Sequence, residues 1–177
     1  QLIFNHRIFP WEEIRLDIYD RKNLTTYEME TLSFCHQWLR GDLSFEITTS
    51  GSTGVPKKIK LTRSQLQASA QLTGKFLNLV SGDQSFVCLD TRFIAGKMML
   101  VRGFELGLDI TIVNPSSYPF TEFSLKDHID FIALVPLQLY TIFSTYPIAT
   151  TLLNSCKAIL VGGASLNKDE LFKILNS

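Results

Sequence analysis

The apolar positions along the chain follow two periods, one typical of strands and one typical of helices. Short stretches that are almost continuously apolar, or that alternate with polar residues, predict β-strands. They are residues 43–48, 58–61, 85–90, 108–113, 130–135 and 157–161. Residues 1–24 have a mixed pattern, to which we assign no element.

Longer stretches with a 3.6-residue period predict helices. They cover residues 25–41, 63–80, 94–107 and 136–143, and a last helix begins at Lys168. The first two carry a capping box at their start, formed by Thr25 with Glu28 and by Thr62 with Gln65. These local signals indicate where the helices begin.

The order of these elements predicts the fold class. Short, nearly all-apolar strands that alternate with helices are typical of a mostly parallel sheet covered on both faces. We therefore expect an α/β fold, with the segment 43–48 among the strands of that sheet. A length of 177 residues suits one compact domain.

Composition narrows the possible functions. Lysine plus arginine equals aspartate plus glutamate at 17 each, so the basic excess typical of a nucleic-acid binder is missing. No apolar run has the length of a membrane span, and the first residues do not have the pattern of a signal peptide. Cys35, Cys88 and Cys156 are widely spaced, which favours free thiols in a reducing, cytoplasmic protein over a disulfide or a catalytic role.

The segment Thr48–Lys57, T-T-S-G-S-T-G-V-P-K, is the most informative one for chemistry. Its glycines allow backbone N–H groups to converge on an anion, its hydroxyls add donors, and Lys57 adds a positive charge. The spacing does not fit a Walker A loop. From composition alone, a phosphate-binding loop and a plain polar hairpin turn both remain open.

The order of residues 49–57 resembles the signature T-S-G-[ST]-T-G-x-P-K of the adenylate-forming (AMP-binding, acyl-CoA synthetase-like) superfamily. The resemblance implies a loop that holds the β- and γ-phosphates of ATP. The residues that it assigns to this role are Thr49, Ser50, Gly51, Ser52, Thr53, Gly54 and Lys57. The chain is thus expected to be part of the large N-terminal domain of such an enzyme.

Three later motifs agree with this resemblance in order and spacing. Ala95-Gly96 is similar to the second motif of the superfamily, although Phe93 stands where many members carry histidine. Val135 and Pro136 open a V-P-L-Q-L sequence that resembles a strand-to-helix turn of acid–CoA ligases. Residues 162–164 resemble the G-G-A motif. By this resemblance the residues that line the adenine and acid pocket are Gly162, Gly163, Ala164, Val135 and Pro136.

The sequence A-G-K-M-M-L-V-R of residues 95–102 is most similar to the o-succinylbenzoate–CoA ligases of menaquinone biosynthesis. An acid with a second carboxylate needs a cation, and Arg102 is the first candidate because a guanidinium can bind a carboxylate with two hydrogen bonds. Lys97 is the second candidate, about 140° away around the same helix. Both side chains could equally be surface cations of an amphipathic helix.

The resemblance implies ATP, Mg²⁺ and CoA as reactants or cofactors, and a small carboxylic acid as partner. The expected catalytic lysine and metal-binding glutamate of the family have no counterpart before Ser177, so no metal ligand is predicted here. The three histidines, His6, His36 and His128, are expected to be structural or exposed. The chain begins with Gln1 and ends just after a predicted helix, so we expect residues 1–177 to be an incomplete N-terminal adenylation domain without its C-terminal domain.

Other functions stay open. The chain could belong to a non-catalytic module that binds a nucleotide or an anion, or to an adenylate-forming enzyme for another aryl or acyl acid. A different flavodoxin-like enzyme with a coincidental loop is disfavoured by the ordered succession of four motifs.

Overall fold

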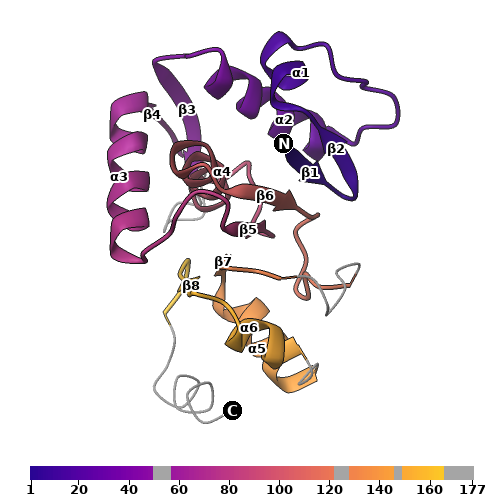
Figure 1. Cartoon of the computed structure of the whole chain (residues 1–177), viewed down its shortest axis with the longest axis vertical. Coiled ribbons are helices and arrows are strands. Elements are labelled where there is room, and N and C mark those ends of the chain that lie inside the picture. Colours follow the sequence, from indigo (N-terminus) through magenta and orange to yellow (C-terminus); the bar gives the residue numbers. More distant parts are fainter. Residues whose placement is uncertain (50–56, 122–127, 146–148, 166–177) are drawn as a thin grey trace.

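The computed structural model describes residues 1–49, 57–121, 128–145 and 149–165. Its centre is a six-stranded sheet of order β2-β1-β6-β5-β7-β8 (Figure 1). The strands are β1 Leu2–Phe4, β2 Arg7–Phe9, β5 Gln84–Val87, β6 Asp109–Ile112, β7 Phe131–Leu134 and β8 Ala158–Val161. Every neighbouring pair is parallel except β1 with β2, which confirms the mostly parallel α/β prediction.

The continuously apolar strands are buried on both faces. On β5 and in the two residues after it, Phe86 and Cys88 belong to one hydrophobic core, whereas Val87 and Leu89 belong to the other. Successive side chains of a strand point to opposite faces, so each core receives every second residue. This explains why the sequence lacks the apolar–polar alternation of a half-exposed strand.

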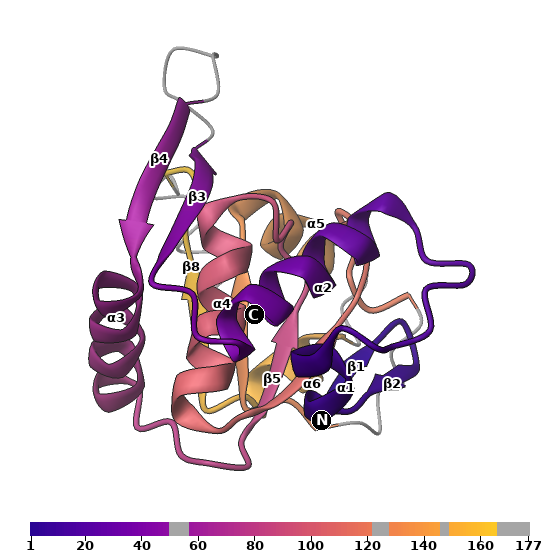
Figure 2. The ribbon, with the colours of Figure 1, turned by 90° about the horizontal axis from the view of Figure 1, so that it is seen from above.

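Helices cover both faces of the sheet, as predicted (Figure 1, Figure 2). One core contains residues of α1 Trp11–Leu16, α2 Thr26–Leu39, α3 Arg63–Phe76 and α4 Ile94–Leu106. The other contains residues of α5 Pro136–Thr145 and α6 Thr150–Asn154. The capping boxes at the starts of α2 and α3 are both present.

The prediction that residues 43–48 join the parallel sheet is wrong. Strand β3 (Ser44–Thr49) pairs antiparallel with β4 (Lys57–Thr62) in a separate two-stranded sheet. A parallel connection needs a crossover of a dozen or more residues, and only residues 50–56 join these two strands. Phe45 and Ile47 are buried in the core that α4 also enters, so the hairpin packs beside the main sheet (Figure 2).

Residues 1–24 form more structure than their mixed pattern suggested. Leu2 pairs with Ile110 of β6, and the β1–β2 turn has positive φ at Asn5 (44°) and His6 (65°). Positive φ at both central residues is what a two-residue type I′ hairpin turn requires. Asparagine between two apolar runs was the available sequence signal for this hairpin.

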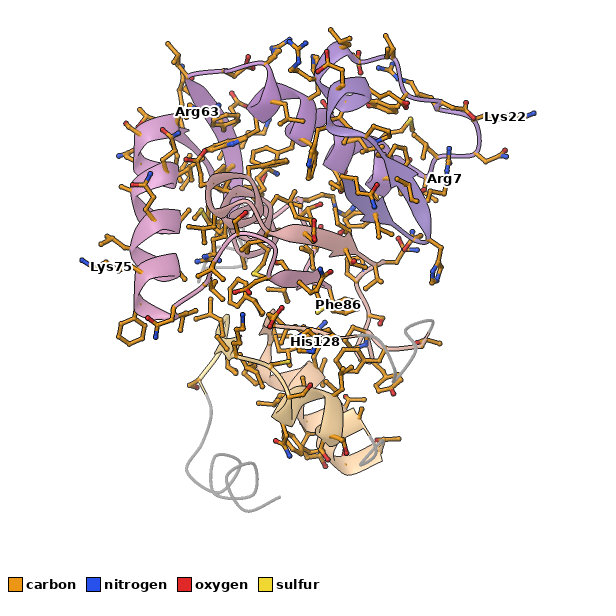
Figure 3. The ribbon with its side chains drawn as sticks, viewed as in Figure 1. Arg7, Lys22, Arg63, Lys75, Phe86 and His128 are labelled. Atoms are coloured by element: carbon orange, nitrogen blue, oxygen red, sulfur yellow. The ribbon has the colours of Figure 1, made fainter. Side chains whose placement is uncertain are left out.

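The helix predicted over 63–80 ends earlier, at Phe76. Asn78 has φ 53°, and the Leu79 amide donates to the Gly74 carbonyl at 2.9 Å. A residue in the left-handed region after the last turn is a common way to end a helix. Leu79 thereby returns to the core, while Lys75 extends from α3 into solvent (Figure 3).

Candidate functional site

The carboxyl ends of the parallel strands meet at one edge of the sheet, where open α/β folds bind their ligands. Residues 90–93 follow β5 there, Val135 follows β7, and Gly162 follows β8. The sequence motifs that resemble those of adenylate-forming enzymes lie at these strand ends. We call this region the carboxyl edge.

The hairpin brings the two ends of the predicted phosphate loop to the same edge. Thr48, near the end of β3, forms an isolated parallel bridge with Phe93, the N-cap residue of α4. The backbones of Thr49 and Lys57 are paired across the hairpin. Their side chains, and the predicted phosphate ligands Ser50, Gly51, Ser52, Thr53 and Gly54, lie outside the described residues. The structure therefore locates the two ends of the loop.

The predicted pocket residues after β7 and β8 are brought together. The Gly162 amide donates to the Leu134 carbonyl at 3.1 Å. Gly163 has φ 88°, and a Cβ added there would lie 3.3 Å from Cγ1 of Val135. The exposed backbone of residues 162–164 therefore runs beside the turn that Val135 and Pro136 open.

Gln138 holds this part of the carboxyl edge together, a role that the sequence did not reveal. Its side chain is buried, and its Oε1 accepts from the Val135 amide at 3.1 Å. Its Nε2 donates to the carbonyls of Cys88 at 3.3 Å and Ser116 at 2.9 Å. One amide thus links the end of β5, the end of β7 and the segment after β6. The Q of the V-P-L-Q-L motif was the only available signal.

Lys97 lies in the first turns of α4 and turns back onto the loop that precedes this helix. Its Nζ donates to the carbonyl oxygens of Thr91 at 2.9 Å and Arg92 at 3.2 Å. Burial lowers the pKa of Lys97 below its ordinary value. The two carbonyl acceptors, and not the pKa, show that the Lys97 ammonium is already engaged by the protein.

Arg102 occupies a different environment from Lys97. It lies about 12 Å along the helix axis from Ile94, where α4 begins at the carboxyl edge. The residue is only 8% exposed, and its Nη1 lies 3.9 Å from the Met99 sulfur. Within the described parts of the chain its Nε has no hydrogen-bond partner. Burial lowers the pKa of this guanidinium. The two predicted carboxylate ligands thus do not meet at one point.

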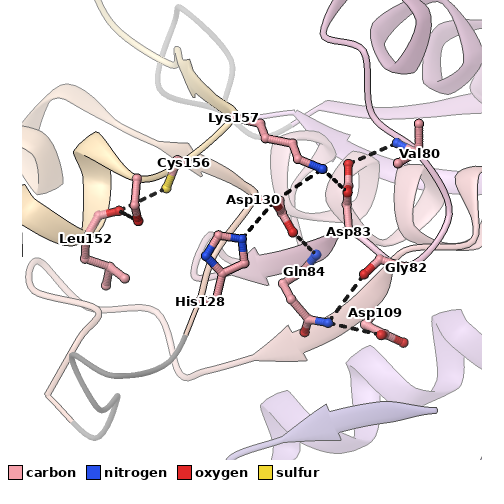
Figure 4. Close-up of polar contacts among 11 residues, drawn as sticks. Val80, Gly82, Asp83, Gln84, Asp109, His128, Asp130, Leu152, Cys156 and Lys157 are labelled. Carbon is pink, nitrogen blue, oxygen red and sulfur yellow. Dashed lines mark hydrogen bonds and ion pairs between the residues drawn. The ribbon is translucent and has the colours of Figure 1, made fainter.

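The opposite edge of the sheet is joined by charged groups rather than by motif residues (Figure 4). Lys157, just before β8, pairs with Asp83 and with Asp130, the latter at 3.4 Å. Asp130 also accepts from the Gln84 amide at 2.8 Å and contacts His128 at 2.9 Å. These contacts connect the beginnings of three neighbouring strands, so we assign them to stability.

A cavity of about 400 Å³ also lies away from the carboxyl edge. Its walls include Trp11, Trp38, Arg63, Phe104 and Asp109, and none of the predicted site residues lines it. Arg63 already stacks on the Trp38 ring and donates to the Trp38 carbonyl. The cavity carries no group that marks it as the reaction site.

The described residues were also compared with the requirements of a metal site and of a membrane-spanning helix. Among the described residues, no group of three or more histidine, cysteine, aspartate or glutamate side chains could hold a metal ion. In the same residues, no helix is both long and apolar enough to cross a membrane. The described cysteines Cys35, Cys88 and Cys156 are free thiols.

Comparisons with known proteins agree with the arrangement at the carboxyl edge. The sequence model of the family described as AMP-binding enzyme matches residues 18–175. A solved acyl-CoA synthetase (AMP-forming)/AMP-acid ligase II-like protein from Dyadobacter fermentans is 38% identical, with a TM-score of 0.79. That match covers 89% of this chain and 44% of the Dyadobacter protein, so the chain spans less than half of that relative. No match was found among curated proteins.

More distant solved structures share the fold. E. coli MenE, with a bound analogue of OSB-AMS, is 21% identical with a TM-score of 0.56, and the match covers 74% of this chain and 27% of MenE. ATP-bound MatB from Rhodopseudomonas palustris is 13% identical with a TM-score of 0.61, over 74% of this chain and 26% of MatB. The sequence model of the family, the Dyadobacter relative and the meeting of the motifs at one edge all agree, and the chain belongs to the AMP-binding enzyme family.

Proposed function

We propose that this chain is the incomplete N-terminal adenylation domain of an acid–CoA ligase, in which ATP activates a carboxylic acid as its acyl-adenylate. Pyrophosphate is released in that step, and the acyl group then passes to the thiol of CoA with release of AMP. The observation that carries the proposal is the Thr48–Phe93 bridge. It joins the start of the T-S-G-S-T-G-V-P-K loop to the edge where Val135 and Gly163 lie side by side.

The residues predicted for this site would suit a nucleotide. Hydroxyls and glycine amides of residues 49–54 would bind the phosphates, with Lys57 offsetting their charge. The exposed backbone of residues 162–164 carries no bulky side chain and would lie against the base and the acid. Mg²⁺ would accompany ATP, with its protein ligands outside residues 1–177. Binding at the edge positions the reactants, which is most of what an in-line attack on a phosphate requires.

Arg102 supports an acid with a second carboxylate, and we propose o-succinylbenzoate. A buried guanidinium without a full set of partners is costly, and an incoming carboxylate would supply acceptors. The similarity of residues 95–102 to o-succinylbenzoate–CoA ligases points to the same acid. MenE was solved with an analogue of OSB-AMS, but at 21% identity it supports only the fold.

Two alternatives have different expected behaviour. An adenylate-forming enzyme for another aryl or acyl acid would use the same loop and a differently lined acid pocket. A module that only binds a nucleotide or an anion would retain the loop without chemistry.

Free buried thiols at Cys35 and Cys88 suit a reducing cytoplasm, where we propose that the protein acts.

The test is exchange of labelled pyrophosphate into ATP by the longer protein to which we assign this chain. Exchange should depend on o-succinylbenzoate and be much weaker with benzoate, and addition of CoA should give the thioester. Residues 1–177 alone should exchange poorly. Pyrophosphate exchange that depends only on another acid would support an adenylate-forming enzyme for that acid. Nucleotide binding without exchange with any acid would support the binding module.

A further inference from the structure

The loop between β5 and α4 links the two halves of the candidate site. It contains Asp90, Thr91 and Arg92, and ends at Phe93, whose backbone bridges Thr48 beside the phosphate loop. The Phe93 side chain is 37% exposed at the carboxyl edge. The position of this loop therefore determines where α4 starts. It also determines where Phe93 meets Thr48, the residue just before the predicted phosphate loop.

The loop is held from one side by its own residues and by α2. Thr91 Oγ1 and Thr31 Oγ1 lie 2.6 Å apart in a buried hydrogen bond. The Asp90 carboxylate accepts from the Arg92 side chain at 2.7 and 3.0 Å, and the Phe93 amide donates to the Asp90 carbonyl at 3.1 Å. These contacts leave the carbonyls of Thr91 and Arg92 directed toward α4.

Lys97 binds those two carbonyls from the other side. Its Nζ uses two of its three N–H donors, at 2.9 Å to Thr91 and 3.2 Å to Arg92. The ammonium also lies 5.3 Å from the centre of the Phe34 ring, on α2. One N–H donor remains, so a substrate carboxylate at Lys97 could form only one hydrogen bond without displacing these carbonyls.

We propose that Lys97 is a positioning residue: it fixes the β5–α4 loop so that Phe93 stays paired with Thr48 at the start of the phosphate loop. This inference rests on the proposed function and changes the role expected for Lys97 from ligand of the acid to internal support of both substrate sites. Removing its donors loosens Phe93 and so weakens ATP use and acid use together.

The first measurement needs no substrate. Hydrogen exchange of the Phe93 amide should be several-fold faster in Lys97→Met than in the parent, because the apolar stem is kept and both donors are lost. Lys97→Arg, which restores donors, should return the rate toward that of the parent. Lys75→Met, a change of the exposed lysine on α3 (Figure 3), is the matched control and should leave the rate unchanged.

The second measurement separates positioning from acid binding. In the longer protein, Lys97→Met should raise KM for ATP and for the acid by similar factors, each about two- to tenfold, as expected for the loss of a net hydrogen bond. Lys97→Arg should recover most of both. A rise in KM for the acid alone, with unchanged exchange at Phe93, would overturn the proposal and make Lys97 an acid ligand.

Amide exchange at Phe93 and the KM measurements can fail independently of each other. A parent protein without pyrophosphate exchange would contradict the ligase proposal, while amide exchange at Phe93 would still decide whether Lys97 holds the loop. Should Lys97→Met unfold, Lys97→Gln is measured in its place, because its side chain is one bond shorter and uncharged and should not hold both carbonyls. If the Phe93 amide exchanges no faster in Lys97→Gln than in Lys75→Met, the positioning role of Lys97 is contradicted.

Discussion

Gly96 in the first turn of α4 lies directly against the backbone of Asp90. A Cβ added at Gly96 would be 2.4 Å from the Asp90 carbonyl oxygen and 2.7 Å from the Thr91 Cα. Real Cβ atoms do not approach backbone so closely, so glycine is required for this contact. The close approach lets α4 start immediately beside the end of β5, at the carboxyl edge.

Gly96→Ala should therefore destabilise the protein by roughly 1–3 kcal/mol, the usual cost of overpacking. Gly74→Ala is the matched control, because the atoms nearest to its added methyl belong to the Leu106 side chain, which can move, and not to backbone. Urea denaturation of both variants measures the difference. Equal midpoints for Gly96→Ala and Gly74→Ala would show that the helix start tolerates a shift.

Arg102→Met should separate stability from specificity. Because the guanidinium is buried with an unsatisfied Nε, its replacement by an apolar side chain should stabilise the protein without substrate by roughly 1–3 kcal/mol. Arg63→Met should do the opposite, because it removes the hydrogen bond and the ring contact to Trp38. Thermal denaturation of the two variants is the measurement.

The same Arg102→Met variant tests the second carboxylate of the acid. KM for o-succinylbenzoate should rise sharply and KM for ATP should stay nearly unchanged. Discrimination against a monocarboxylate analogue should shrink by roughly 2–5 kcal/mol, as for truncating one partner of a buried charge pair. If the variant prefers the dicarboxylate as strongly as the parent does, Arg102 has no part in recognising it.

Lys57→Ala should weaken ATP use in the longer protein, because it removes a cation expected to face the polyphosphate. A charge-assisted contact of this kind corresponds to about a ten- to hundredfold loss in kcat/KM for ATP. Lys58→Ala, on the neighbouring position of β4, is the control, since Lys58 is exposed and pairs with Glu46. Equal losses for the two variants would contradict a specific role of Lys57.

Acid should destabilise the protein partly through Asp130. Burial alone would raise the pKa of this carboxyl, but the hydrogen bonds from the Gln84 amide and His128, together with the charges of His128 and Lys157, outweigh it and hold the pKa below its ordinary value of 3.8. A lowered pKa in the folded state gives stability that is complete above the unfolded pKa. That stability is lost as the pH falls from about 3.8 through the folded value.

The measurement is the free energy of unfolding as the pH is lowered from about pH 6 through the unfolded pKa and below it. Asp130→Asn should be less stable than the parent at pH 6 and should show a shallower decline as the pH falls. Glu13→Gln, at an exposed position on α1, provides the comparison. A parent and an Asp130→Asn variant with parallel pH curves would rule out this contribution.

Local sequence signals were sufficient for much of the fold. Thr25 and Glu28 lie within one helical turn of each other, so their capping box could be predicted and is present. The near-continuous apolar run 85–89 indicated burial on both faces, because a strand between two helical layers has no polar side. In both cases the deciding contacts involve neighbours in the chain or a simple period.

Pairing between distant segments could not be predicted in the same way. Leu2 became part of a strand because Ile110 offers it a parallel partner, and nothing in residues 1–24 specifies that partner. Residues 43–48 have the composition of a core strand, and the short connection of residues 50–56 decided for a hairpin. Strand propensity states that a segment can pair, and the rest of the fold determines with what.

The candidate site divides along the same line. The order of residues 49–57 predicted the phosphate loop and indicated the family, because a nine-residue signature is local information. Only the tertiary structure paired Thr48 with Phe93, set Gly163 against Val135 and turned Lys97 onto its own loop. These relationships join separate elements, and they arise from the packing of the strands and of α4, which the linear order of residues does not contain.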